Sequence, residues 1–196
     1  MKQSNALRLV CGEFREAVMD FPWMDVKPVI KGSLRAWRAA GTAARSVNVL
    51  GRVDIVDSDF VHIRGDARAW LHTVKVILCK GFTDAAFVHL RGIQGPWLII
   101  NGCRQITDAA SVHLRGIQKL EIAFCEQIMD AAFVHSRGIH ALKMYNCNQE
   151  TIMDAAFVHL RKIQTLIMQG YNQESITDAA FVHLRGIQSL DMDNCT

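Results

Sequence analysis

Histidine and arginine recur together at fixed intervals along this chain. Six of the eight histidines share one sequence context, and an arginine follows two residues after each of them. A row of imidazole and guanidinium groups is suited to binding an acidic partner, or to sensing pH near the histidine pKa of about 6.5. We favour the plainer interpretation, a solvent-facing pair copied with its repeat, because charge runs usually form solvated faces. The pairs are His62/Arg64, His89/Arg91, His113/Arg115, His135/Arg137, His159/Arg161 and His183/Arg185.

Cysteine recurs in the same periodic way. Five of the six cysteines share one position, namely Cys79, Cys103, Cys125, Cys147 and Cys195. Stacking would bring neighbouring thiols close enough to suggest a metal site or disulfides. However, Tyr171 stands at the same position in one unit and no C-x-x-C pair occurs. We therefore predict reduced, metal-free thiols that act as small buried hydrophobic groups in a reducing cytoplasm, nucleus or virion.

The sequence contains no pattern that predicts catalysis. It has no G-x-S-x-G, H-E-x-x-H, P-loop or G-x-G-x-x-G motif. Histidine and aspartate are abundant, but they are copies within a repeat and form no unique set of nucleophile, base and orienting group. We predict that the protein is not an enzyme and uses no cofactor.

The elements that position these residues come from an internal repeat of the type ITDAAFVHLRGIQ. Its aspartates are Asp57, Asp84, Asp108, Asp130, Asp154 and Asp178, at spacings of 27, 24, 22, 24 and 24 residues. These periods fall within the range of leucine-rich repeats. We predict an α/β fold, a right-handed leucine-rich-repeat solenoid with one parallel strand ladder and helices on its convex side.

The first half of each unit predicts a short helix. Thr or Asp at its start can accept hydrogen bonds from free backbone amides. Phe87, Leu90 and Ile93 form one apolar stripe, Ala86 allows close approach of a neighbouring helix, and Gly92 suits the helix stop.

The second half of each unit predicts a very short strand with the pattern L-x-ϕ-x-x-C. Leu98, Ile100 and Cys103 are one example, and seven such segments begin with the one that contains Val47 and Val49. Because successive side chains of a strand alternate between faces, the named apolar residues point inward. We therefore expect Phe87, Leu90, Leu98 and Ile100 to be buried together.

The outward strand positions are the candidate binding site, because they differ from unit to unit while the helical halves are near copies. Solenoids use such concave surfaces for recognition. Trp97, Ile99, Tyr145 and Ile167 are the expected anchors, since exposed apolar side chains often bind something. The candidate residues are Lys75, Trp97, Ile99, Glu121, Lys143, Tyr145, Ile167 and Asp191, with Asn48, Ala123, Gln169 and Asp193 on the same strands.

The repeat resembles that of the F-box/leucine-rich-repeat proteins, in their cysteine-containing subtype, over residues 45–196. Residues 1–44 form a predicted helical head that resembles the C-terminal part of an F-box, with a possible adaptor-docking helix at Leu7, Val10, Cys11 and Phe14. The resemblance implies a substrate-recognition adaptor for ubiquitin ligation that docks a Skp-type partner. The near-identical tandem copies also resemble expanded families of protists and large DNA viruses. The alternative function is a structural repeat protein of a larger assembly, for example a virion component.

The charge and hydropathy of the sequence limit the classes of partner that we expect. Residues 1–52 contain nine Lys/Arg and four Asp/Glu, so positive charge gathers in the head. A net charge of +3 is too small to predict nucleic-acid binding, and no segment reads as a signal peptide or membrane span. We expect a protein partner on the concave face, no nucleic acid and no membrane. Residues 176–196 form a strand edge at which another chain is expected to dock.

Overall fold

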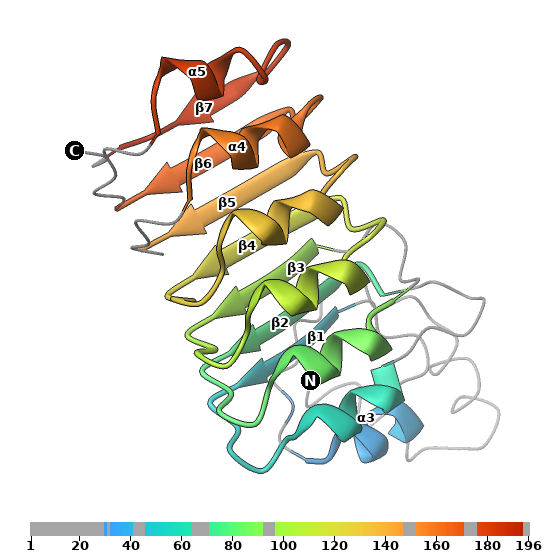
Figure 1. Ribbon diagram of the computed structural model, residues 1–196. Coiled ribbons are helices and arrows are strands. Elements are labelled where there is room, and N and C mark those ends of the chain that lie inside the picture. Colours follow the sequence, from blue (N-terminus) through green and yellow to red (C-terminus); the bar gives the residue numbers. More distant parts are fainter. Residues whose placement is uncertain are drawn as a thin grey trace, which may run out of the picture.

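The computed structural model shows a ladder of stacked units (Figure 1). It describes residues 30, 32–40, 46–63, 71–91, 97–146, 152–170 and 176–193. All strand pairs are parallel, and the strands lie side by side in chain order in one sheet. The strands are β1 (Ser46–Leu50), β2 (Thr73–Ile77), β3 (Trp97–Asn101), β4 (Lys119–Ala123), β5 (Ala141–Tyr145), β6 (Thr165–Gln169) and β7 (Ser189–Asp191). The predicted seven-stranded parallel ladder is confirmed.

The described helices of the units all lie on one side of the sheet (Figure 1). Most are 3-10 helices rather than α-helices, in keeping with the three-residue spacing of the apolar stripe. The Leu90 amide, for example, donates to the Phe87 carbonyl at 3.0 Å. The helices are α3 (Leu34–Ala40), η1 (Asp57–Ile63), η2 (Asp84–His89), η3 (Asp108–His113), η4 (Asp130–His135), α4 (Asp154–Phe157), η5 (Val158–Leu160) and α5 (Asp178–Phe181).

One continuous apolar core lies between the helices and the sheet and extends from Ile30 to Leu184. Phe87, Leu90, Leu98 and Ile100 are each at most 3% exposed and belong to this core, as predicted. The short helices therefore derive their stability from packing, because isolated helices of this length are unstable in water.

The repeat aspartates join each unit to the next. Asp84 Oδ1 accepts a hydrogen bond from the Thr107 amide at 2.8 Å, and Asp84 Oδ2 accepts one from Thr107 Oγ1 at 2.6 Å. Thr107 Oγ1 in turn accepts from the Ala109 amide, so the threonine caps its own helix as predicted. The inter-unit role of the aspartate was not predicted. The same paired contacts join Asp57 to Thr83 and Asp154 to Thr177.

Two units, with Met129 and Met153, contain methionine where three others have the capping threonine. Asp130 Oδ1 therefore accepts a hydrogen bond from the backbone amide of Met153, at 2.8 Å, without a second bond from a hydroxyl. Burial raises the pKa of the Asp130 carboxyl. The hydroxyl and amide of Thr177, by contrast, lower the pKa of Asp154. Asp108 likewise accepts a hydrogen bond from the backbone amide of Met129.

We expect Met153→Thr to stabilise the fold by about 1 kcal/mol, because it adds a hydroxyl bond to Asp130 and a helix cap. Met153 is 50% exposed, so little burial is lost. The change should lower the folded-state pKa of Asp130, which burial raises in the wild type. The part of the gain that comes from the carboxylate is therefore complete above the wild-type pKa and disappears as pH falls, whereas the part from the helix cap remains. Urea unfolding at about pH 7 and about pH 3 measures this. A gain of equal size at both pH values would contradict the assignment to the carboxylate.

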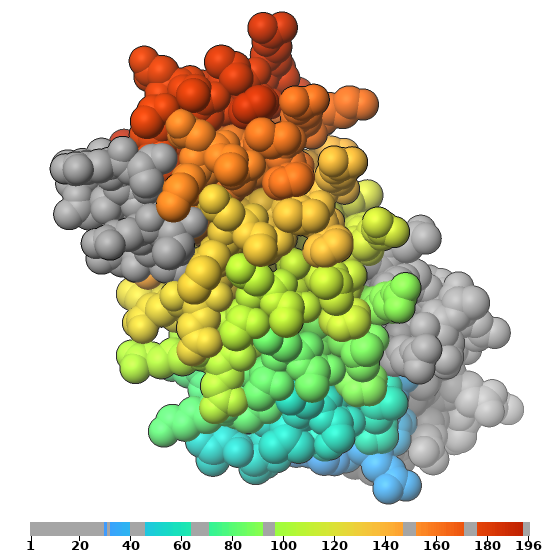
Figure 2. Space-filling model, viewed as in Figure 1, coloured from blue at the N-terminus to red at the C-terminus, as the bar shows by residue number. Residues whose placement is uncertain are grey.

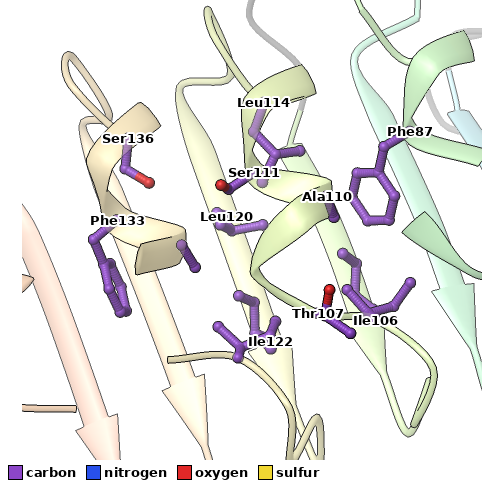
Figure 3. Close-up of a pocket in the computed structure, with 13 residues that line it drawn as sticks. Phe87, Ile106, Thr107, Ala110, Ser111, Leu114, Leu120, Ile122, Phe133 and Ser136 are labelled. Atoms are coloured by element: carbon purple, nitrogen blue, oxygen red, sulfur yellow. The ribbon is translucent and has the colours of Figure 1, made fainter. Parts of the chain in front are cut away.

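Two serines interrupt the core between η3 and η4. Ser111 stands where the other units have phenylalanine, Ser136 stands where four others have leucine and one has isoleucine, and both serines are buried. Between them lies a small cavity of about 20 Å³ that is lined mainly by apolar side chains, including Phe87, Leu120 and Phe133. Figure 3 shows both serine side chains pointing into the gap between the two helices. The cavity is a packing defect that follows from the two short side chains.

Ser136→Leu restores the residue of the other units, and we expect it to stabilise the fold by about 1 kcal/mol by filling the cavity. Ser136→Ala is the matched control, because it removes the hydroxyl without filling the space. Chemical denaturation of both variants measures the difference. A leucine variant that is less stable than the alanine variant would show that the site is already tightly packed.

Helix α3 closes the N-terminal end of the described core. Leu34 of α3 is fully buried, the Ile30 amide pairs with the Asn48 carbonyl of β1, and Arg52 Nη1 donates to the Ile30 carbonyl at 2.7 Å. The predicted boundary between residues 44 and 45 lies outside the described residues, as do Leu7, Val10, Cys11 and Phe14. At the other end, Leu190 of β7 is 44% exposed. Chain docking at that edge stays a prediction.

Candidate protein-binding face

The sheet surface opposite the described helices, here called the open face, is the surface that the sequence predicts to be concave. Strand register places one outward side chain of each unit directly beside that of the next. A row therefore crosses the whole ladder in the order Asn48, Lys75, Ile99, Glu121, Lys143, Ile167, Asp191. The register therefore brings these residues into one row, and their role in binding stays a prediction.

The row is polar at several points and apolar at others, on a backbone that repeats almost unchanged. Lys75, Glu121, Lys143 and Ile167 are each half-buried, so part of every side chain stays accessible. In adjacent rows, Trp97 stands at the start of β3 and Tyr145 at the end of β5, both half-buried. A surface of this kind offers apolar contact area and hydrogen-bonding groups side by side, as protein interfaces do.

Ile99 does not fit the expectation of an exposed anchor, because it is only 6% exposed. The register places it between the longer side chains of Lys75 and Glu121, with Trp97 two residues earlier on the same strand face. Ala123 is also buried, at 5% exposed. Both residues therefore form the floor of the face.

Side chains on the open face are held by contacts between units. The Lys143 ammonium lies 5.7 Å from the Trp97 ring centroid, a cation–π contact that joins β5 to β3 across β4. Contacts of this kind are worth about 0.5–1 kcal/mol when exposed. Gln169 Nε2 donates to Asp191 Oδ2 at 2.9 Å. These contacts pre-order Trp97 and Asp191, which reduces the entropy lost on binding a partner.

Tyr145 has a protonated hydroxyl at neutral pH. Burial, followed by the negative charges of Glu121 and Asp191, raises the pKa of its phenol. A neutral phenol combines a large apolar ring with a polar tip, a combination enriched at interfaces.

The helical face carries the histidine and arginine rows. The described histidines of the repeat are half-buried and the described arginines are exposed, so the arginines face solvent more fully than the imidazoles do. Arg91, Arg115, Arg137, Arg161 and Arg185 are exposed, whereas Arg64 lies outside the described residues.

The helical face also exposes one valine in every unit, which was not predicted from the sequence. These valines are 36–57% exposed, and each follows the inward-facing position of its helix, which is phenylalanine in all units but one. The three-residue period of the helix could have predicted this row, because it places the valine outward when the phenylalanine before it points inward. The residues of this valine row are Val61, Val88, Val112, Val134, Val158 and Val182. Figure 2 shows the helical face, with the units packed against one another along the ladder.

The described cysteines are buried between units. Cys79, Cys103 and Cys125 are at most 1% exposed, and each thiol lies within hydrogen-bonding distance of a backbone carbonyl. In the described part of the chain, no group of three or more His, Cys, Asp or Glu side chains is placed to hold a metal ion. Cys11, Cys147 and Cys195, together with Tyr171, lie outside the described residues.

Burial raises the pKa of the Cys103 thiol to about 11, so we expect it to resist alkylation in the folded protein. The unfolded thiol ionises near pH 9, so this group should destabilise the fold progressively as pH rises from about 9 towards 11. Iodoacetamide labelling of native and denatured protein, followed by peptide mass spectrometry, measures the protection. Equal labelling rates in the two states would contradict it.

Comparison with known proteins identifies the fold. No protein-family model and no curated protein sequence matches the chain. Among solved structures, the chain is similar to TLR13 in the crystal structure of a TLR13–ssRNA13 complex, with a TM-score of 0.63 and 16% identity. The similarity covers 83% of this chain and 23% of that chain, so this chain spans less than a quarter of its neighbour. With the parallel ladder, it identifies a leucine-rich-repeat solenoid, the fold that the repeat predicts.

No described helix is both long enough and apolar enough to cross a bilayer.

Proposed function

We propose that this protein is a non-catalytic scaffold that holds a protein partner on the open face of its solenoid. One observation carries the proposal. The row from Asn48 to Asp191 changes chemistry from unit to unit, while the strand register beneath it is constant. Variable side chains on a fixed, repeated backbone are the usual design of a solenoid recognition surface.

The chemistry of the open face favours a protein over a polyanion. Lys75 and Lys143 are offset by Glu121 and Asp191 in the same row, so the row gathers no net positive charge. Binding of nucleic-acid backbones depends on concentrated Lys and Arg. The TLR13 structure is a complex with ssRNA13, whereas the mixed charge of this row supports a different kind of ligand here.

Affinity capture with matched baits tests the proposal. The protein is compared with Trp97→Ala/Tyr145→Ala on the open face and with His113→Ala/Arg115→Ala on the helical face, by quantitative mass spectrometry. A protein that is recovered with the wild type and the helical-face variant, and lost with the open-face variant, is the expected partner. Partners lost only with the helical-face variant would contradict the proposal.

The finer proposal is a substrate-recognition adaptor for ubiquitin ligation. It is supported by the resemblance of the repeat and head to F-box/leucine-rich-repeat proteins, with Leu7, Val10, Cys11 and Phe14 as the adaptor-docking helix. Recovery of a Skp-type adaptor with the wild type, and its loss with Leu7→Ala/Phe14→Ala, is the expected result. Capture of an open-face partner without any such adaptor would refute the ubiquitin role and leave the scaffold role intact.

The second candidate function is a structural repeat protein packed into a larger assembly. The valine row supports it, because six exposed apolar side chains along one face provide a continuous stripe for lateral packing. Substituting Val88, Val112 and Val134 with threonine should then prevent assembly without unfolding the chain. Assembly that is unaffected by these changes would contradict this function.

A further inference from the structure

In the four units where the turn after the short helix is described, it passes through one left-handed residue, and in one of them this residue is not glycine. Gly116, Gly138 and Gly186 have φ values of 96°, 90° and 86°, whereas the equivalent Lys162 has a φ of 75°. A side chain is sterically disfavoured in this conformation. Strained residues persist where the surroundings hold them, and they concentrate at functional sites.

Lys162 lines a groove of about 530 Å³ on the turn side of two adjacent units. Its other lining residues are Arg137, Gly138, Val158, His159 and Arg161. Gly138 is the residue equivalent to Lys162 in the preceding unit, and a Cβ built on it would meet no atom within 4 Å. The groove is therefore open beside Gly138, and its volume lies in the range of small-molecule pockets.

The groove gathers positive charge that nothing in its lining neutralises. Arg137, Arg161 and Lys162 are exposed, and none of the lining residues is acidic. These three side chains form no ion pair or hydrogen bond in the described structure. Asp154 lies in the same unit, but both of its carboxylate oxygens accept hydrogen bonds from Thr177.

We propose that this groove binds a compact phosphorylated small molecule that carries at least two negative charges. Guanidinium groups match phosphate oxygens in a bidentate geometry, and the lysine adds a point charge. The lining has no aromatic side chain on which a nucleobase could stack. Arg115 and Arg185 are each followed by glycine, whereas Arg161 is followed by Lys162. Two adjacent cationic residues therefore occur at this repeat position in one unit alone. A single site of this kind favours a compact ligand over a linear polymer.

Isothermal titration calorimetry of the full chain with inorganic pyrophosphate tests this site. The wild type should bind saturably at physiological ionic strength. Lys162→Gly restores the glycine of the other units, so it should raise the melting temperature while it weakens binding by about tenfold or more. Arg115→Ala, an equivalent arginine outside the groove, is the matched control and should leave the dissociation constant unchanged.

Three results would overturn the proposal. They are the absence of saturable pyrophosphate binding, an unchanged dissociation constant in Lys162→Gly, and an equal loss in Arg115→Ala, which would indicate diffuse attraction to the arginine row. A parallel titration with single-stranded poly(U) tests the alternative ligand class, a linear polyanion. Tighter binding of poly(U) that depends on Arg115 would assign the surface to a linear polymer instead.

Discussion

Phe82→Ala should lower the free energy of unfolding by about 3–5 kcal/mol, a large share of the stability of an ordinary domain. Phe82 is fully buried and stands between two other phenylalanines. Its ring centroid lies 4.8 Å from that of Phe60 and 5.2 Å from that of Phe87, both in tilted geometry. The substitution therefore removes a buried ring and two aromatic contacts, and leaves a cavity where two adjacent units meet.

The other units supply the matched control, because all five of them have isoleucine at this position. Phe82→Ile keeps most of the apolar volume, and we expect it to cost about 1–2 kcal/mol. Guanidinium unfolding followed by circular dichroism measures both variants. A loss below about 1 kcal/mol for the alanine variant would mean that the phenylalanine cluster does not hold these units together.

Trp97→Ala and Tyr145→Ala should each weaken partner binding by about 2 kcal/mol or more, which is roughly a 30-fold rise in the dissociation constant. Both residues present a large ring at the open face, and Lys143 orders the Trp97 ring before binding. Burying such a ring in a partner removes about 150–250 Å² of surface from water, and aromatic residues therefore dominate the energetics of many interfaces.

Two matched variants separate recognition from stability in this experiment. Lys143→Ala removes the cation from the Trp97 ring but not the ring itself, so it should weaken binding less than Trp97→Ala does. Arg115→Ala lies on the helical face and should not change the dissociation constant. Titration calorimetry with the captured partner measures all four variants, and an effect of Arg115→Ala larger than that of Trp97→Ala would contradict the site assignment.

The backbone arrangement was predictable because the period of the repeat fixes it. Each L-x-ϕ-x-x-C segment must pair in register with its copy in the next unit, so Leu98 stacks on Leu120 and Ile100 on Ile122. The same alternation places Lys75, Glu121 and Lys143 on the opposite face. The period of the repeat therefore predicts the strand ladder, the core and which residues lie on the open face.

Other features depend on contacts between units, which a single repeat does not reveal. Asp84 begins its own helix, yet its carboxylate binds Thr107 of the following unit. The exposure of Ile99 depends on the lengths of its neighbours across the sheet, and strand alternation alone does not give them. The role of Lys162 depends on the backbone conformation, because a lysine in place of a glycine is informative only where φ is positive.

Site-specific photo-crosslinking tests the central claim, that the open face is the recognition surface, most directly. A photoreactive phenylalanine analogue replaces Lys143 on the open face or His113 on the helical face, and irradiation follows partner binding. We expect a covalent adduct with the partner from position 143 and none from position 113. An adduct from position 113 alone would contradict the claim, because it would place the partner on the helical face.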